Sequence, residues 1–178
     1  MNVAVFVALV VIGTVANLAF SWSFSIRARR YHGVYRFFSF ESILLLALLC
    51  APVWFSDPLS WNQLISWALL IVAIFLPLCG FHTLCTVGKP EHQIENTTRL
   101  VTSGVYRYIR HPLYASLIIL GTGIFFKNIT LTTAMCALVN LVALVATAKT
   151  EEREMLKKFG EEYARYMERT KMFIPFVV

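Results

Sequence analysis

The chain has 178 residues, of which 58% are hydrophobic and 15% are charged, whereas soluble domains carry about 25% charged residues. This composition excludes a soluble globular domain, because so much apolar surface could not be covered. The net charge of +6 comes from basic residues between apolar runs, which favours a membrane surface over a nucleic acid as their partner.

Five apolar runs follow one another along the chain, and a membrane-spanning helix needs about 20 such residues. The second run is short and Pro52 interrupts it, while Pro77 and Gly80 are expected to kink the third. Lys127-Asn128 is expected to form a tight turn that makes the last two runs antiparallel neighbours. The runs cover residues 3–26, 40–55, 64–85, 112–126 and 129–148.

The segment from Thr150 onward changes character, because its apolar residues recur at helical spacing among charged ones. This pattern predicts an amphipathic helix on the membrane surface or against the bundle, although a solvated tail that merely anchors is the alternative. The predicted fold class is therefore all-α: a polytopic membrane bundle of about five transmembrane helices with a C-terminal amphipathic helix. We assign residues 1–85 to N-terminal transmembrane helices and residues 86–178 to a loop, the last two spans and this helix, within one integrated membrane domain.

The basic residues predict the orientation in the membrane. In a five-span topology, every lysine and arginine except Lys127 falls in the first connection, in the third connection or in the tail, all on one side. The positive-inside rule then places the N-terminus outside and the C-terminus in the cytoplasm.

The cysteines predict neither a disulfide framework nor a metal site. They lie mostly in apolar runs, where thiols behave as small apolar groups. Cys79 and Cys85 flank His82, but two cysteines six residues apart point in different directions on a helix, and structural zinc needs about four converging ligands.

Two features predict a site at the cytoplasmic end of the last two apolar runs. One is residues 104–114 (GVYRYIRHPLY), which lead into the fourth run; the other is Glu151-Glu152 at the end of the fifth. A helix N-terminus attracts a ligand carboxylate, Glu152 suits an ammonium group, and the tyrosines suit a heterocycle or cation. A zwitterion fits this combination, and a plain ion pair between Arg110 and the glutamates is the alternative. Glu151 is expected to point about 100° away from Glu152 around the helix.

Residues 106–114 (YRYIRHPLY), the glutamate pair and residues 159–166 (FGEEYARY) resemble the isoprenylcysteine carboxyl methyltransferase family, whose wider group includes membrane phospholipid methyltransferases. The resemblance covers residues 100–175, including the terminal FIP. It implies S-adenosylmethionine as methyl donor and a cytoplasmic cofactor pocket. Because the fourth and fifth runs are almost wholly apolar up to the motif, a lipophilic acceptor is expected to enter from the bilayer. The cofactor-binding residues that the resemblance implies are Val101, Gly104, Tyr106, His111, Leu113, Tyr114 and Glu152. His111 and Glu152 are the candidate catalytic residues, because an amine acceptor must lose a proton.

One position departs from the family pattern. Carboxyl methyltransferases of this family carry an arginine five residues before the second glutamate, where this chain has Thr147. Family similarity therefore favours a prenylcysteine-type carboxyl acceptor, whereas Thr147 favours a phospholipid amine. The rival function is a non-catalytic membrane protein, such as a small transporter or assembly factor. Charges deep in a span would favour transport, but Glu41 is expected only at the edge of the second run.

Overall fold

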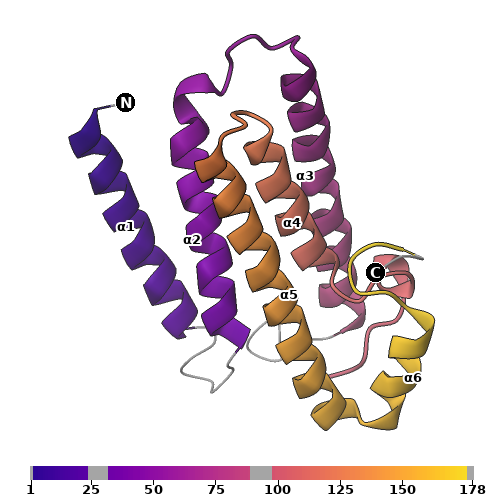
Figure 1. Cartoon of the computed structure of the whole chain (residues 1–178). Helices are drawn as coiled ribbons and strands as arrows, with labels where there is room; N and C mark the ends of the chain where they lie inside the picture. The colour runs from indigo at the N-terminus through magenta and orange to yellow at the C-terminus, as the bar shows by residue number, and fades with distance from the viewer. Residues whose placement is uncertain (1, 24–31, 89–97, 176–178) are drawn as a thin grey trace. The chain divides into compact units, whose positions relative to one another are not determined.

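The computed structural model describes residues 2–23, 32–88 and 98–175. Within these ranges the chain is helical and has no strand, which confirms the predicted all-α class. Within the described residues, most of each of the five apolar runs lies in a helix. The helices are α1 (Val3–Ser21), α2 (His32–Cys50), α3 (Trp61–Val87), α4 (Pro112–Phe125), α5 (Leu131–Phe159) and α6 (Glu161–Arg169), with short 3-10 turns η2 (Ala51–Val53) and η3 (Gly104–Arg107) (Figure 1).

Four segments are long and apolar enough to cross a membrane: Val3–Ser21, His32–Val53, Trp61–Val87 and Leu131–Phe159. The chain therefore has the composition of a multi-pass membrane protein. Helix α4 is shorter, with 14 residues, so it extends only about 21 Å against a hydrocarbon core of about 30 Å. The fourth predicted run is thus a helix, but an apolar helix below spanning length.

Two helix boundaries differ from the predicted ones. Helix α2 begins at His32 rather than at residue 40, so Glu41 lies in its middle. The expectation that no run holds a charge well inside it is therefore wrong. Helix α5 continues past residue 148 to Phe159 and ends only at Gly160, whose φ is +56°. The predicted amphipathic segment is consequently shared between the end of α5 and α6.

The described residues form two compact units. The first unit comprises Met1–Ile71 and Ile118–Thr147, and in it α1 packs along α2 (Figure 1). Glu41 of α2 accepts hydrogen bonds from the Thr14 hydroxyl and, over 3.2 Å, from Nδ2 of Asn17. These two α1 side chains explain how a charged residue is accommodated inside a predicted span.

The core of the first unit is small and partly polar. Leu46 and Cys50 of α2 are fully buried beside Ile124 of α4. Ser39 of α2 donates a 2.7 Å hydrogen bond to Asn140 of α5. These contacts join α2 to α4 and α5, which lie far from it in the sequence.

The connection between α4 and α5 is anchored by one buried lysine in the first unit. Lys127 is 2% exposed. Its Nζ donates to Oε1 of Gln63 over 2.8 Å and lies 3.4 Å from the centre of the Trp67 ring. The predicted turn at Lys127-Asn128 is present, within a slightly longer connection of residues 126–130.

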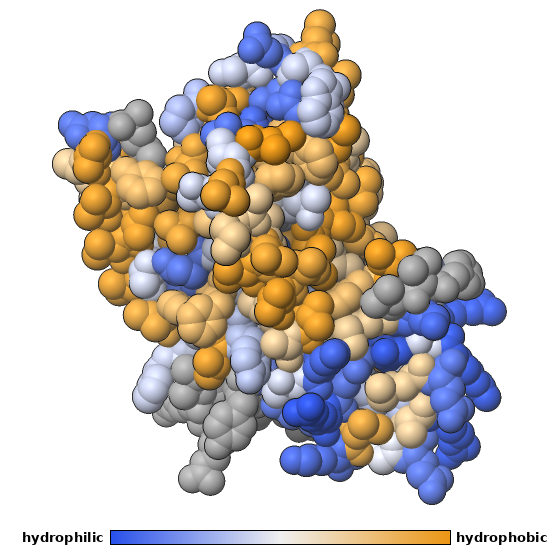
Figure 2. All heavy atoms as spheres, viewed as in Figure 1, coloured by the Kyte–Doolittle hydropathy of each residue, from blue (hydrophilic) through white to orange (hydrophobic). Residues whose placement is uncertain are grey.

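The second unit comprises Val72–Leu117 and Ala148–Val178, so it contains both features that the sequence singled out. It holds the end of α3, the loop of residues 98–111, the first turns of α4, the end of α5, and α6. Charged side chains gather over the end of α5 and α6 (Figure 2). Large apolar side chains of α1, α3 and α5 are exposed instead, as expected for helices that face lipid.

Candidate functional site

The loop before α4 approaches α3 closely at Gly104. Gly104 has a φ of +60°, and a Cβ atom at this position would lie 2.8 Å from Oγ1 of Thr83. Only glycine meets both conditions, because other residues rarely adopt positive φ and their Cβ would collide with α3. The backbone of η3 then turns directly into the motif that opens α4.

The C-terminal segment is hydrogen-bonded to this loop. Lys171 N donates to the Tyr108 carbonyl over 3.2 Å, and Arg110 N donates to the Lys171 carbonyl over 2.8 Å. His111 N donates to the Met172 carbonyl over 3.1 Å. The result is a short parallel pairing of Ile109 with Lys171, which sequence periodicity did not predict.

A second attachment comes from α6 itself. The Tyr166 hydroxyl donates to the Tyr106 carbonyl over 2.7 Å. Burial raises the pKa of both phenols well above the ordinary value, so each remains neutral and Tyr166 keeps its donor proton. Tyr163, which is also buried, packs against Tyr166 with ring centres 5.8 Å apart.

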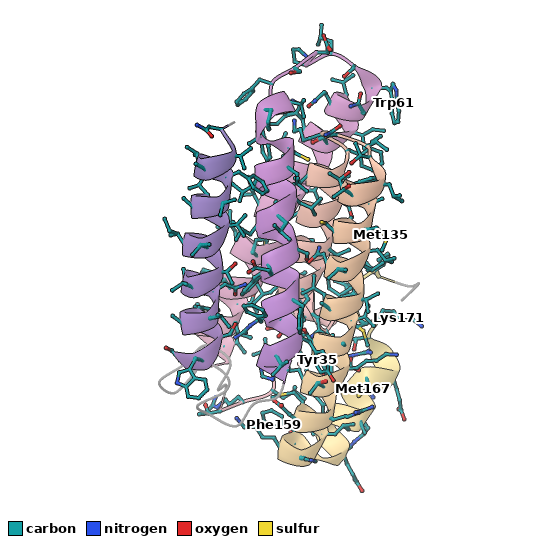
Figure 3. All side chains as sticks on the ribbon, turned by 60° about the vertical axis from the view of Figure 1, so that its left-hand side comes forward. Tyr35, Trp61, Met135, Phe159, Met167 and Lys171 are labelled. Atoms are coloured by element: carbon teal, nitrogen blue, oxygen red, sulfur yellow. The ribbon has the colours of Figure 1, made fainter. Side chains whose placement is uncertain are left out.

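Arg110 joins three segments of this unit. Its Nε donates to Oε1 of Glu152 on α5 over 2.6 Å. Its Nη1 donates to the Met167 carbonyl over 3.2 Å and to both the carbonyl and the hydroxyl of Thr170. Met167 and Lys171 are labelled in this C-terminal region in Figure 3. Because the last carbonyls of a helix lack partners within the helix, a cation at the end of α6 is favourable.

His111 lies between the two glutamates. Its Nε2 is 3.3 Å from Oε1 of Glu152, and its Nδ1 is 3.7 Å from Oε2 of Glu151. The two glutamates are neighbours on the continuous helix α5, and the imidazole lies near both of them because each of its nitrogens faces a different carboxylate. The His111 ring also stacks on Tyr114, with centres 5.4 Å apart, and meets Phe173 at 6.2 Å.

The Arg110–Glu152 ion pair exists, but it uses only one carboxylate oxygen. Both Arg110 and His111 contact Oε1. Among the residues that the structure describes, none forms a hydrogen bond or ion pair with Oε2. The Glu152 side chain can therefore pair with Arg110 through Oε1 and bind a ligand through Oε2 at the same time.

The structure brings some of the predicted site residues together directly. His111, Tyr114 and Glu152 form one contiguous cluster, and Tyr106 is linked to its surroundings through Tyr166. Val101 is buried and Leu113 is half-buried. For Val101, Gly104 and Leu113, no direct polar contact with this cluster is seen in the described ranges.

Sequence reasoning missed two contributors to the cluster. It gave Arg110 no contact with the C-terminal helix, whereas the guanidinium holds the end of α6. It did not assign any role to Thr170. The arginine that directly precedes the motif histidine was the available signal, but its partners on α6 lie about 60 residues further along.

Residues 64–157, slightly more than half of the chain, match the isoprenylcysteine carboxyl methyltransferase (ICMT) family. The chain belongs to this family. Family membership agrees with the resemblance carried by the RHPxY element and the glutamate pair. Of the cluster, Arg110, His111, Tyr114 and Glu152 lie within the matched residues.

Three relatives show the range of proteins that this chain is similar to. It is 33% identical over 61% of its length to the human protein-S-isoprenylcysteine O-methyltransferase, and 30% identical over 61% to methanethiol S-methyltransferase 1 of Bradyrhizobium diazoefficiens. It is 41% identical over 52% to the cobalt-zinc-cadmium resistance protein CzcN of Cupriavidus metallidurans. The matches span 40%, 38% and 45% of these relatives, so the chain covers less than half of each.

Proposed function

We propose that this protein is an S-adenosylmethionine-dependent integral membrane methyltransferase that acts on a lipophilic acceptor. The observation that carries the proposal is the clustering of His111, Tyr114 and Glu152, with Oε1 of Glu152 fixed by Arg110. Relatives from two distinct groups, named for O-methyl and S-methyl transfer, support methyl transfer as the common chemistry.

The side chains of this cluster fit the chemical groups of the cofactor. S-adenosylmethionine carries an ammonium, a carboxylate, a purine and a sulfonium that supplies an activated methyl group. Oε2 of Glu152 suits the ammonium, and the parallel His111 and Tyr114 rings suit a purine. The loop that contains Val101, Gly104 and Tyr106, together with Leu113 at the start of α4, forms the remaining proposed cofactor-binding residues. Pro112 at the first position of α4 leaves the next backbone N–H groups for a carboxylate.

The protein's own contribution to methyl transfer is alignment and exclusion of water. His111 and Glu152 are 7% and 6% exposed, so the cluster is shielded even before a ligand covers it. A protic acceptor must also lose a proton. His111 is the proposed recipient, because Glu151 and Glu152 flank its ring and would balance the imidazolium charge. Glu152, which Arg110 already holds, is then proposed to bind rather than to exchange a proton.

The acceptor is proposed to lack a carboxylate. Thr147 is fully buried, and its hydroxyl donates to the Ala143 carbonyl one turn earlier in α5 over 2.8 Å. This position therefore offers no charged donor for two parallel hydrogen bonds to a carboxylate. A phospholipid amine is the leading acceptor, and a prenylcysteine carboxyl, which the human relative's name suggests, is the second candidate.

The non-catalytic alternative is weakened by the way Glu41 is held. A charge inside a span is a feature of transport proteins, but this carboxylate is engaged by Thr14 and Asn17 of the neighbouring helix. The contact is therefore explained by the pairing of α1 with α2.

We propose a cytoplasmic cofactor site, an outward N-terminus and a cytoplasmic C-terminus, following the distribution of basic residues. Of these basic residues, Arg27, Arg29, Arg30 and Lys89 lie outside the described residues.

One experiment tests the proposed function. Protein purified in lipid nanodiscs is titrated calorimetrically with S-adenosylmethionine, and then incubated with methyl-labelled cofactor and a total lipid extract, with Glu152→Gln as control. Saturable binding and a labelled lipid product are expected from the native protein, with both reduced in the variant. Absence of binding and of labelled product from well-folded native protein would favour the non-catalytic alternative.

A further inference from the structure

The arrangement of Arg110 has a consequence for how the site is assembled. One guanidinium contacts Glu152 on α5 through Nε and the Met167 and Thr170 carbonyls through Nη1. The arginine side chain is 9% exposed. A planar guanidinium presents these donors in a fixed fork, so the position of the α6 end and the position of the Glu152 carboxylate are not independent.

We infer that Arg110 is a positioning residue that couples docking of the C-terminal segment, residues 163–173, to the placement of Glu152. The segment is docked by four further contacts that do not involve the Arg110 side chain. They are the Tyr166–Tyr106 hydrogen bond, the backbone pairs of Lys171 with Tyr108 and Arg110, and the pair of His111 with Met172. Each contact that holds the segment also favours the geometry in which Arg110 fixes Oε1 of Glu152.

Coupling of this kind is reciprocal. A ligand that binds Glu152 in the position held by Arg110 stabilises the docked segment. Conversely, loosening the segment lowers the affinity for that ligand by the same factor. Taking S-adenosylmethionine as the ligand rests on the proposed function. The link between Arg110, Glu152 and the segment itself does not.

Hydrogen–deuterium exchange of the segment, read by mass spectrometry, measures the docking without any turnover. Arg110→Gln is expected to accelerate exchange of residues 163–173 by about 10- to 100-fold, since several hydrogen bonds to a charged donor are lost. Glu152→Gln is expected to accelerate it too, by a smaller factor, although in the described part of the chain no hydrogen bond or ion pair links Glu152 directly to the segment. Arg110→Lys is expected to lie between, because an ammonium cannot reproduce the fork.

Tyr166→Phe separates this coupling from a general loss of structure. It removes the hydroxyl that donates to the Tyr106 carbonyl, and it leaves Arg110 and Glu152 chemically intact. The apparent affinity for S-adenosylmethionine should fall about 3- to 10-fold, as expected when the binding-competent population decreases. The KM for the cofactor should rise while kcat at saturating cofactor is retained. Arg169→Gln is the matched control, because Arg169 is exposed on α6 and makes no polar contact among the described residues.

The outcomes distinguish the alternatives. Unchanged exchange of the segment in Glu152→Gln, or unchanged cofactor affinity in a Tyr166→Phe protein whose segment exchanges faster, would overturn the coupling. If the native protein binds no S-adenosylmethionine, the proposed function fails. The exchange rates of Arg110→Gln and Glu152→Gln without ligand then still decide whether Arg110 links Glu152 to the segment.

Discussion

Nε of Arg110 lies 2.6 Å from Oε1 of Glu152, while Nε2 of His111 lies 3.3 Å from the same oxygen. Two donors therefore converge on one carboxylate oxygen that is provided by the end of α5. The two glutamates are placed differently around the imidazole, so they are expected to contribute differently to ligand binding.

Glu152→Gln is expected to weaken S-adenosylmethionine binding about 10- to 150-fold, because a hydrogen bond to a charged partner contributes roughly 1.5–3 kcal/mol. Glu151→Gln should have a smaller but measurable effect of about 2- to 5-fold, since it faces His111 at 3.7 Å and its side chain is 22% exposed. Calorimetric titration of both variants measures the difference. Equal, small effects would indicate that the pair only closes the helical hairpin.

Gly104→Ala is expected to destabilise the protein by roughly 1–3 kcal/mol, because a positive φ is unfavourable for alanine and its Cβ would lie 2.8 Å from Thr83 Oγ1. Gly160→Ala is the matched control: its φ is +56°, but a Cβ there would meet nothing within 4 Å. Thermal unfolding in one detergent compares the two. If both variants lose the same stability, the contact with α3 contributes nothing beyond backbone strain.

Lys127→Met is expected to destabilise the protein by roughly 1–3 kcal/mol. The substitution leaves Gln63 Oε1 without its charged donor and removes the ammonium from the Trp67 ring. Lys157→Met, at an exposed position of α5, should change the unfolding temperature little. Equal unfolding temperatures for the two variants would show that the buried ammonium is not stabilising.

The acceptor can be tested by direct competition between substrates. Turnover on phosphatidylethanolamine is expected to exceed turnover on a farnesylated cysteine analogue, because Thr147 cannot hold a carboxylate. Thr147→Arg should not improve turnover on the natural acceptor, since it replaces a fully buried hydroxyl with a charge. Robust methyl-ester formation on the cysteine analogue, without activity on the amine lipid, would restore a carboxyl acceptor.

Topology is tested with reporter fusions. A reporter after Val178 is expected to read cytoplasmic, and one inserted between Asp57 and Trp61 is expected to read external, because nearly all basic residues lie on one side in the predicted topology. The opposite pattern would reverse the proposed side of the cofactor site.

Apolar runs were sufficient to predict where α1 to α5 lie, because a helix satisfies the backbone groups of an apolar stretch within the stretch itself. The start of α2 was not predictable from hydropathy, since His32, Arg36 and Ser39 interrupt the apolar residues before 40. The accommodation of Glu41 also depends on side chains of α1. The contact between the RHPxY element and the glutamate pair followed from an antiparallel hairpin. The pairing of Ile109 with Lys171 did not, because it is formed by backbone groups of segments far apart in sequence.

The hydrogen bonds from Thr14 and Asn17 to Glu41 also bear on biosynthesis. Placing a helix with a carboxylate in its middle into hydrocarbon by itself costs free energy. Helix α1 is apolar enough to insert without a partner, and Thr14 and Asn17 then offer donors to Glu41. Helix α1, which supplies the donors, precedes α2, which supplies the charge, along the chain. Stable integration of α2 is therefore expected to require α1 beside it in the bilayer.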